Sequence, residues 1–454
     1  MIRKSIATYF GYLLQDLINK TDILDTLILL KESQYWSEDR IYEYQLKKLK
    51  KIIHYSKYNV PYYEKLFKKI KFDSSDIITL QDINKIPILT KEIVRKENMN
   101  LIARNFNKKL VRIGKTGGTT GAPVIVYSDI YNRSFTWASY YRWYEWMGLN
   151  YYDSIATFWG GPTVLSKSYK KIIISNITNF IQNNKIYDSF LMSDTNMLSM
   201  YNSIVQNKPV LLKGYLSAMI SFAQYIDNNK FKIEKLKALS TTTETLLPHN
   251  RLFLEQVFNA PIYDQYGGGE ISAISYECGR HNGLHINQEH VICQILDENN
   301  LNILNKSGYI IATDLDNLVM PFIRYKNDDM ATLTLDKCSC GVNQPLMQSI
   351  EGRTIDTITL ANGNKVHGVF ITDILFELGI STNQIQRFQV YQEVGGDIEF
   401  RFESKFSLSL DQIKKIEFAL RRFFNHVNIV ETKHIPNEKN GKFKYIINNI
   451  YNNQ

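Results

Sequence analysis

The stretch Lys115-Thr116-Gly117-Gly118-Thr119-Thr120-Gly121-Ala122-Pro123 lies between two apolar runs, Leu110–Ile113 and Val124–Tyr127. This pattern predicts a strand, a glycine-rich loop and a second strand. Glycine has no Cβ, so successive N–H groups can form a concave nest for an anion, and the threonines and Lys115 add donors and charge. The loop therefore suits a polyphosphate. It is not a Walker loop, because no Gly-Lys-Ser/Thr closes it, and a plain hairpin turn is the alternative.

The composition describes a globular protein of more than one domain. The chain has 454 residues, of which 44% are hydrophobic and 22% charged. The net charge of +9 is modest and the lysines alternate with acidic and apolar residues, so no nucleic-acid partner is expected. We find neither a secretory signal nor an apolar run that could span a bilayer, and four cysteines do not make a disulfide framework. We expect a cytoplasmic protein without a membrane span.

Apolar periodicity divides the chain into regions of different character. The expected regions are a helical leader over 1–100, a buried aromatic helix over Phe135–Trp146, alternating strands and helices over 170–265, consecutive strands over 284–335, and an α+β unit over 357–454. The alternation predicts mostly parallel sheet, with the run Lys171–Ile174 as one of its strands. The expected fold class is α/β, with a large domain of mixed and parallel sheets followed by a small α+β domain.

Four further segments follow the glycine-rich loop in order. They are Asp264-Gln265-Tyr266-Gly267-Gly268-Gly269-Glu270, Pro321-Phe322-Ile323-Arg324-Tyr325-Lys326-Asn327-Asp328-Asp329, Gly352-Arg353-Thr354-Ile355-Asp356, and Gly441-Lys442. Together they resemble the adenylate-forming ligase superfamily, in its phenylacetate–CoA ligase-like branch and most of all that branch's capsular polysaccharide biosynthesis members. The resemblance extends from about residue 45 to 445. The chain departs from the family pattern at Ala122, Gly269 and Asp328, which leaves room for lowered activity.

The resemblance implies ATP-dependent adenylation of a carboxylic acid to an acyl-AMP. The acyl group would then pass to a thiol, coenzyme A, or to an amine, in capsular or surface polysaccharide biosynthesis. It also implies a large adenylate-forming domain over 1–352 and a mobile lid over 353–454, and the expected assembly is a homodimer. The alternative is a non-catalytic nucleotide-binding or assembly protein on the same fold.

The same resemblance implies roles for individual residues. Lys442 and Glu270 would be catalytic, with Glu270 holding Mg²⁺. Arg353 and Asp356 would form the hinge of the lid. The nucleotide-binding residues would be Thr116, Gly117, Gly118, Thr119, Thr120, Gly121, Glu244, Asp264, Tyr266, Gly267, Arg324 and Asp329. Among them, Asp329 would bind the ribose hydroxyls and Arg324 would support ribose or phosphate.

The cysteines suggest a metal site. Cys338 and Cys340 form a knuckle-like pair, and Cys278 lies upstream near His281 and His285. Three thiolates and one imidazole make a closed tetrahedral Zn²⁺ site, which is structural because no position stays open for water. We prefer His285 as the fourth ligand, with His281 as its rival. Free cytosolic thiols are the alternative to a zinc site.

Overall fold

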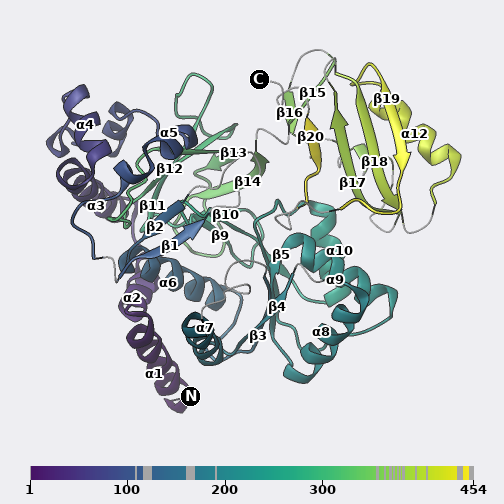
Figure 1. The fold of residues 1–454 in the computed structure, drawn as a ribbon, viewed down its shortest axis with the longest axis horizontal. Coiled ribbons are helices and arrows are strands. Elements are labelled where there is room, and N and C mark those ends of the chain that lie inside the picture. The colour runs from purple at the N-terminus through teal and green to yellow at the C-terminus, as the bar shows by residue number, and fades with distance from the viewer. Residues whose placement is uncertain are drawn as a thin grey trace.

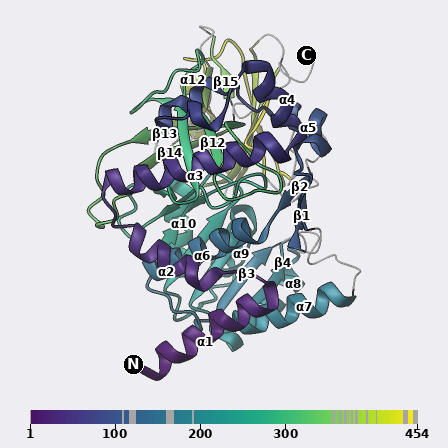
Figure 2. The same cartoon turned by 90° about the vertical axis from the view of Figure 1, so that its left-hand side faces the viewer.

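The computed structural model is drawn in Figures 1 and 2. It describes residues 2–107, 110–115, 125–159, 169–189, 192–353, 357–361, 365–367, 371, 374–375, 378, 380, 384–393, 396–404, 407–436 and 443–448. These residues form a parallel sheet, a large antiparallel sheet, a separate β hairpin and a C-terminal α+β unit. The mixed α/β class predicted from the sequence is confirmed.

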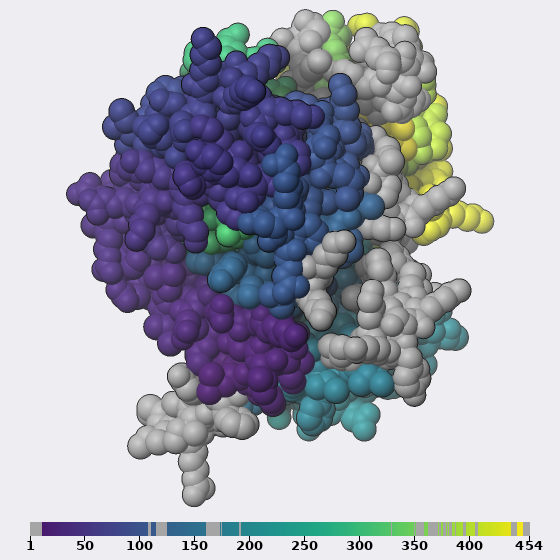
Figure 3. Space-filling model, turned by 60° about the vertical axis from the view of Figure 1, so that its left-hand side comes forward, coloured from purple at the N-terminus to yellow at the C-terminus, as the bar shows by residue number. Residues whose placement is uncertain are grey.

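Helices dominate the first hundred residues, as predicted. They are α1 (Ile2–Asn19), α2 (Ile23–Ser33), α3 (Glu38–Asn59), α4 (Pro61–Ile70) and α5 (Lys91–Glu97), with 3₁₀ turns at Ser74–Asp76, Leu80–Lys85 and Asn98–Leu101. Ser37 caps α3 by accepting a hydrogen bond from the Arg40 N–H, and Pro61 is the first residue of α4. The apolar side of α3 shares a hydrophobic core with the antiparallel sheet, which the helix crosses in Figure 2. The leader thus covers much of one side of the molecule (Figure 3).

Five parallel strands form the sheet between residues 155 and 263, in the order β4-β3-β5-β6-β7. The strands are β3 (Ile155–Trp159), β4 (Asn184–Asp188), β5 (Leu211–Tyr215), β6 (Ala238–Thr242) and β7 (Ile262–Tyr263). The helices between them are α7 (Tyr169–Ile181), α8 (Asp194–Asn207), α9 (Leu216–Asn228) and α10 (Pro248–Phe258). The predicted parallel sheet is confirmed. The predicted strand Lys171–Ile174 is wrong, because this run lies inside α7; so short an apolar run has no periodicity that separates helix from strand.

Seven antiparallel strands form the second sheet, in the order β11-β12-β13-β14-β10-β9-β8. They are β8 (Gln265–Tyr266), β9 (Ser275–Glu277), β10 (Leu284–Ile286), β11 (Val291–Leu296), β12 (Ser307–Asp314), β13 (Tyr325–Thr334) and β14 (Leu346–Arg353). Strands β10 to β13 confirm the consecutive strands predicted for 284–335. Because β7 and β8 are separated only by Asp264, the two sheets meet at this residue.

Helix α6 (Ile130–Trp146) packs between the two sheets. Its buried aromatic side chains share one core with Leu211 and Ala238 of the parallel sheet and Tyr276 of the antiparallel sheet. Trp143 Nε1 donates to the Glu277 carbonyl at 2.8 Å. Burial on several sides explains why aromatic residues occur around most of the helix, and the expectation of a buried aromatic helix is confirmed.

The C-terminal unit has its own hydrophobic core, built from residues after 357. Its elements are β15 (Thr357–Thr359), β16 (Lys365–His367), β17 (Ile385–Gln392), β18 (Ile398–Ser404), α12 (Leu410–Leu420), β19 (Val427–Glu431) and β20 (Ile446–Asn448). The unit lies beside α9 and α10 (Figure 1). Asn250 Nδ2 donates to Tyr445 Oη at 3.1 Å, and Arg387 Nη2 donates to Ser221 Oγ at 2.8 Å. Across all described residues, no helix has the length and apolarity that crossing a bilayer requires.

Candidate active site

The glycine-rich loop is carried by an antiparallel hairpin. Strands β1 (Arg112–Lys115) and β2 (Ile125–Ser128) pair so that Lys115 lies opposite Ile125. The two strands predicted on either side of the glycine-rich stretch are therefore confirmed. The residues assigned to phosphate, Thr116, Gly117, Gly118, Thr119, Thr120 and Gly121, lie outside the described residues, as does Ala122. Their role stays a prediction.

The exit of this hairpin is fixed against the segment that precedes Arg324. Asn317 Nδ2 donates to the Tyr127 carbonyl at 2.9 Å. Asp129 caps α6 by accepting from the Asn132 N–H, and its second oxygen accepts from the Leu318 N–H at 2.9 Å. The hairpin is thus held to the chain that leads into the predicted nucleotide-binding segment Pro321–Asp329.

Two side chains, one from the segment Asp264–Glu270 and one from Pro321–Asp329, donate hydrogen bonds to the carboxylate of Asp329. Tyr266 Oη donates to Asp329 Oδ2 at 2.8 Å, and Asn327 Nδ2 donates to the same oxygen at 3.0 Å. Asn327 Nδ2 also donates to Tyr266 Oη. Two donors on one carboxylate oxygen fix its orientation, and hydrogen bonds to a charged acceptor are among the strong ones. The structure therefore brings Tyr266 and Asp329 together, as a shared nucleotide site requires.

Glu270 lies next to this group. Tyr325 Oη donates to Glu270 Oε1 at 3.0 Å. A Cβ on Gly268 would lie 3.3 Å from Glu270 Oε2, and a Cβ on Gly267 would lie only 2.8 Å from the Ala273 N atom. Gly267 therefore allows the backbone to approach the segment at Ala273, and Gly268 leaves room for the Glu270 carboxylate. Glu270 itself is partly exposed.

Asp264, the first residue of the motif, accepts hydrogen bonds from protein groups on both sides of it. Its Oδ1 accepts from the Gln265 N–H at 2.9 Å and from Thr241 Oγ1 at 3.4 Å. Shielding from solvent, and then the nearby carboxylate of Glu277, raise the pKa of Asp264 to about 7. These contacts are to protein groups that join the two sheets. Whether Asp264 also contacts a nucleotide stays a prediction.

Two other predicted nucleotide-binding residues have protein partners. Glu244 Oε1 accepts from Ser217 Oγ at 2.9 Å, beyond the end of β6. Arg324 has a positive φ of 52° and is nearly buried, and its Nη1 donates to the carbonyls of Asn84 at 3.0 Å and Ile86 at 2.6 Å. We expected Arg324 to support ribose or phosphate; the structure instead places its guanidinium against the leader, where the two carbonyl oxygens hold it.

The hinge and the lid lysine are described only in part. Arg353 is the last residue of β14, and its Cα pairs with that of Asp329 on β13. Asp356 and Lys442 lie outside the described residues. The predicted start of the lid is thus adjacent in the sheet to the predicted ribose-binding residue, and the domain boundary stays a prediction.

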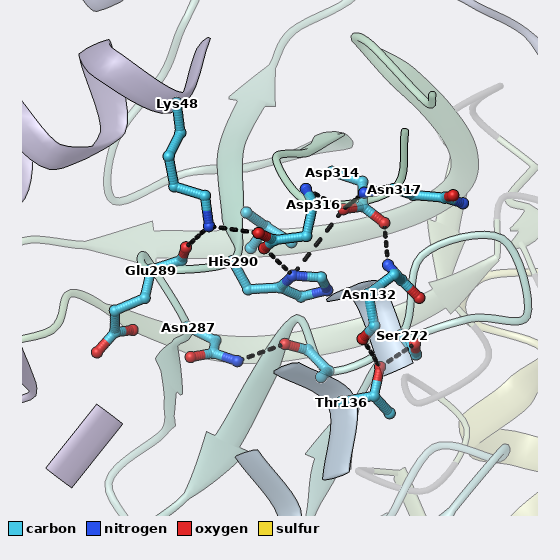
Figure 4. Close-up of polar contacts among 12 residues, drawn as sticks. Lys48, Asn132, Thr136, Ser272, Asn287, Glu289, His290, Asp314, Asp316 and Asn317 are labelled. Carbon is cyan, nitrogen blue, oxygen red and sulfur yellow. Dashed lines mark hydrogen bonds and ion pairs between the residues drawn. The ribbon is translucent and has the colours of Figure 1, made fainter. Parts of the chain in front are cut away.

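A buried polar network joins α3, α6 and the antiparallel sheet (Figure 4). Lys48 Nζ lies 2.6 Å from Asp316 Oδ1, and His290 Nδ1 lies 2.7 Å from Asp316 Oδ2. Asn132 Nδ2 donates to Asp314 Oδ2 at 2.6 Å. Burial opposes protonation of His290, but the two carboxylates outweigh burial and raise its pKa. Because Lys48 and Asn132 already engage the carboxylates, we interpret this group as structural rather than as a metal site.

The same network reaches the loop after Glu270. Arg142 Nη1 pairs with Glu289 Oε1 at 2.9 Å, and both side chains are almost fully buried. Asn287 Nδ2 donates to the Ala273 carbonyl at 3.1 Å, and Thr136 Oγ1 lies 3.0 Å from Ser272 Oγ. Helix α6 is therefore tied to the loop that carries the predicted magnesium ligand.

The predicted zinc ligands converge. One ligand atom from each of Cys278, His285, Cys338 and Cys340 lies within 4.8 Å of all the others. Cys278 and Cys338 Sγ are 3.7 Å apart, and Cys340 Sγ is 3.2 Å from His285 Nε2. Tetrahedral bonds of about 2.0–2.3 Å place ligand atoms at about these separations, so the four residues fit Zn²⁺.

The choice between the two histidines follows from their partners. His285 Nδ1 lies 3.2 Å from the Gln344 carbonyl, which leaves Nε2 turned to Cys340. Burial lowers the pKa of His285 to about 4, so the imidazole is neutral, the form that binds metals. His281 Nδ1 instead lies against Arg251 and Glu277. The geometry thus favours His285 over its rival.

Some neighbours of the site were missed. Tyr325 and Asn327 belong to the same motif as Asp329 and alternate with it in sequence, but no role was predicted for them. That alternation was the available signal. Lys213 was also missed, and its signal was a single lysine inside the apolar run Val210–Tyr215.

No family model matches the chain. It is 25% identical over 431 residues to Protein CapK of Staphylococcus aureus, which covers 90% of both chains. It is 22% identical over 341 residues to the phenylacetate-coenzyme A ligase of Thermus thermophilus, covering 70% of this chain and 72% of that one. A crystal structure of 2-hydroxyisobutyryl-CoA ligase in the postadenylation state, in complex with R3-HIB-AMP, is similar with a TM-score of 0.77 and 16% identity over 93% of both chains. The same ligase in its thioesterification state gives a TM-score of 0.63.

Fold and sequence point to the same class of protein. The fold is that of the adenylate-forming ligases. In sequence the chain is similar to CapK and to a phenylacetate-coenzyme A ligase, as the motifs predicted.

Proposed function

We propose that this chain is an AMP-forming acid–thiol ligase. In the first step an oxygen of the substrate carboxylate attacks the α-phosphorus of ATP, and the bond to the bridging oxygen breaks, so that pyrophosphate leaves with the electron pair. In the second step the sulfur of coenzyme A attacks the acyl carbonyl carbon, AMP leaves, and the thiol proton passes to solvent. Such reactions need alignment and charge neutralisation more than covalent help from the protein.

The convergence of Tyr266 and Asn327 on Asp329 carries this proposal. A carboxylate oriented by two donors is suited to accept hydrogen bonds from ribose hydroxyls, and the Tyr266 ring gives an apolar border for adenine. Glu270 would hold Mg²⁺, which would neutralise phosphate charge when bound. The hydroxyl of Tyr325 keeps the Glu270 carboxylate in position. The loop at Thr116–Gly121 would hold the leaving phosphates, and Lys442 would reach the α-phosphate and the acid.

The arrangement of the C-terminal unit is consistent with a two-step reaction in which the unit rotates between the steps. The chain resembles the postadenylation state of 2-hydroxyisobutyryl-CoA ligase with a higher TM-score than the thioesterification state, 0.77 against 0.63. The bonds from Tyr445 to Asn250 and from Arg387 to Ser221 would hold the lid in the first arrangement. Rotation at Arg353 and Asp356 would break both bonds and admit coenzyme A.

Several finer assignments belong to the same proposal. A structural Zn²⁺ would bind Cys278, His285, Cys338 and Cys340. The similarity to CapK supports a role in making a capsular or surface polysaccharide, in the cytoplasm where ATP and coenzyme A are available. An amine acceptor in place of coenzyme A and a homodimer stay predictions. The non-catalytic alternative is favoured by Gly269 and Ala122, but the retained Glu270 and Asp329 contacts favour the ligase.

Product analysis tests this proposal. The purified chain is incubated with ATP, Mg²⁺, coenzyme A and a panel of acids, and the products are identified by mass spectrometry. We expect AMP and an acyl-CoA. Asp329→Ala should abolish both products, whereas Asp336→Ala, at an exposed position after the same strand, should not. Release of ADP, or equal product from both variants, would contradict the proposal.

A further inference from the structure

The face of the parallel sheet that packs on α6 changes character along the strands. At its first row this face is apolar and shares a core with α6; the residues of that row are Ile155, Leu211 and Ala238. Two residues further along, Thr157, Lys213 and Ser240 are register partners. Because side chains alternate along a strand, this second row also points toward α6. A polar row with a lysine thus interrupts an otherwise apolar interface.

Lys213 is a cation in an unusual position. Its Nζ donates to Tyr144 Oη at 2.6 Å and lies 5.3 Å and 5.8 Å from the ring centres of Tyr144 and Tyr140. Among the described residues no carboxylate lies within ion-pair distance of it. Shielding from solvent lowers the pKa of Lys213 to about 8, so the amine is mostly charged at neutral pH. A shielded charge held only by aromatic groups is costly unless an anion compensates it.

Lys213 lies in the wall of a cavity between α6 and the sheet. The wall includes Trp137, Tyr141 and Tyr144 from α6, and Ile155, Asn184 and Lys213 from the sheet. Two carboxylates also line the cavity, but Glu145 pairs with Lys31 at 2.8 Å and Asp153 pairs with Lys237 at 3.0 Å. Of the described residues that line this cavity, Lys213 alone carries a positive charge. Neither of the two carboxylates in the lining is paired with it.

Lys213 lies close to a side chain that contacts the motif. Tyr140, whose ring centre is 5.8 Å from Lys213 Nζ, is hydrogen-bonded to Gln265, which stands between Asp264 and Tyr266. Lys213 lies two residues before Tyr215, the last residue of β5, where the rings of Tyr215 and Trp159 are 4.6 Å apart. With a rise of about 3.3 Å per residue, Lys213 is about 7 Å below the edge of the sheet where ligands of α/β folds bind.

We propose that the acid activated by this chain carries a second carboxylate, and that Lys213 binds it. This inference rests on the proposed ligase function and names its substrate class. The reacting carboxylate lies at the edge of the sheet, and the distal carboxylate reaches Lys213 between the aromatic side chains of α6. One lysine balances one negative charge, which favours a carboxylate over a phosphate group. Ser240 supplies a hydroxyl group in the same row, whereas Thr157 Oγ1 donates to Asn184 Oδ1 at 2.6 Å.

Matched acids and variants test the assignment. The acids are terephthalate and adipate, each compared with its monoamide, which has nearly the same shape but no distal charge. The variants are Lys213→Met and, as a control, Lys185→Met, which changes an exposed lysine of the same sheet in the same way. Two readouts are recorded: pyrophosphate exchange, and calorimetric binding in the presence of a non-hydrolysable ATP analogue. Equal unfolding midpoints establish that both variants fold.

We expect the unmodified chain and Lys185→Met to prefer each diacid over its monoamide by about ten- to hundredfold, as a hydrogen bond to a charged group implies. Lys213→Met should lose this preference in both readouts. A preference retained in Lys213→Met, or no preference in the unmodified chain, overturns the assignment even if exchange is observed. Lys213-dependent binding of diacids without any exchange would uphold the assignment and refute the ligase proposal, so the two failures are distinguishable.

Discussion

The hydroxyl of Tyr266 donates a hydrogen bond of 2.8 Å to Asp329 Oδ2, from a residue 63 positions earlier in the chain. The bond joins the edge strand β8 to β13, which is not its neighbour in the sheet. Two motifs that are separate in sequence therefore form one site. In the proposed ligase this bond holds the carboxylate that receives the ribose.

Tyr266→Phe should weaken ATP binding without disabling chemistry. Loss of the hydroxyl removes a bond to a charged acceptor, so KM for ATP should rise about tenfold or more while kcat changes little. Tyr309→Phe serves as the control, because it removes a tyrosine hydroxyl from β12, the strand next to β13. The measurement is steady-state kinetics at varied ATP. An unchanged KM for ATP in Tyr266→Phe would show that the bond does not support the nucleotide site.

Glu270→Gln should impair catalysis through magnesium. The substitution keeps the shape of the side chain but removes the charge that would hold the cation, so kcat should fall about a hundred- to a thousandfold. The Mg²⁺ concentration needed for half-maximal rate should rise as well. Glu298→Gln, in an exposed turn, is the matched control. An unaltered magnesium dependence in Glu270→Gln would argue against its role as a ligand.

The sequence predicted the fold because its signals were local. The alternation over 170–265 and the strand run over 284–335 needed only hydrophobic periodicity, and so did the two strands on either side of the glycine-rich stretch. The arrangement of the site depends on contacts between distant segments. Nothing near Arg324 reveals that its guanidinium bonds the carbonyls of Asn84 and Ile86. Lys171–Ile174 was misassigned because four apolar residues have no period of their own.

The cysteine cluster should hold zinc. Metal analysis of the purified chain should find about one zinc ion per molecule, since three thiolates and an imidazole make a closed site. Cys340→Ser and His285→Ala should lose the metal and lower Tm. Cys293→Ser, which removes a thiol outside the cluster, should keep it. Loss of zinc in His281→Ala but not in His285→Ala would assign the site to the rival histidine.

Stability should depend on pH through Asp264. Its pKa is raised to about 7, above the value of about 3.9 in an unfolded chain, so the folded state binds this proton more tightly. The associated stability is fully present below the unfolded pKa and is lost as pH rises through the folded value. Asp264→Asn should therefore flatten the change in unfolding free energy between pH 5 and pH 8, measured by urea denaturation. If the free energy of unfolding varies with pH in the same way in Asp264→Asn and in the unmodified chain, the raised pKa is contradicted. Asp336→Asn, at an exposed position, is the control.

Adenylation itself is tested most directly by ATP–pyrophosphate exchange with a panel of acids. The unmodified chain should exchange with one class of acid, Lys442→Ala should lose exchange, and Lys433→Ala, an exposed lysine of the same unit, should retain it. That result would establish that the chain forms acyl-adenylates. Tight binding of ATP with no exchange for any acid would contradict the ligase proposal and favour a non-catalytic nucleotide-binding protein.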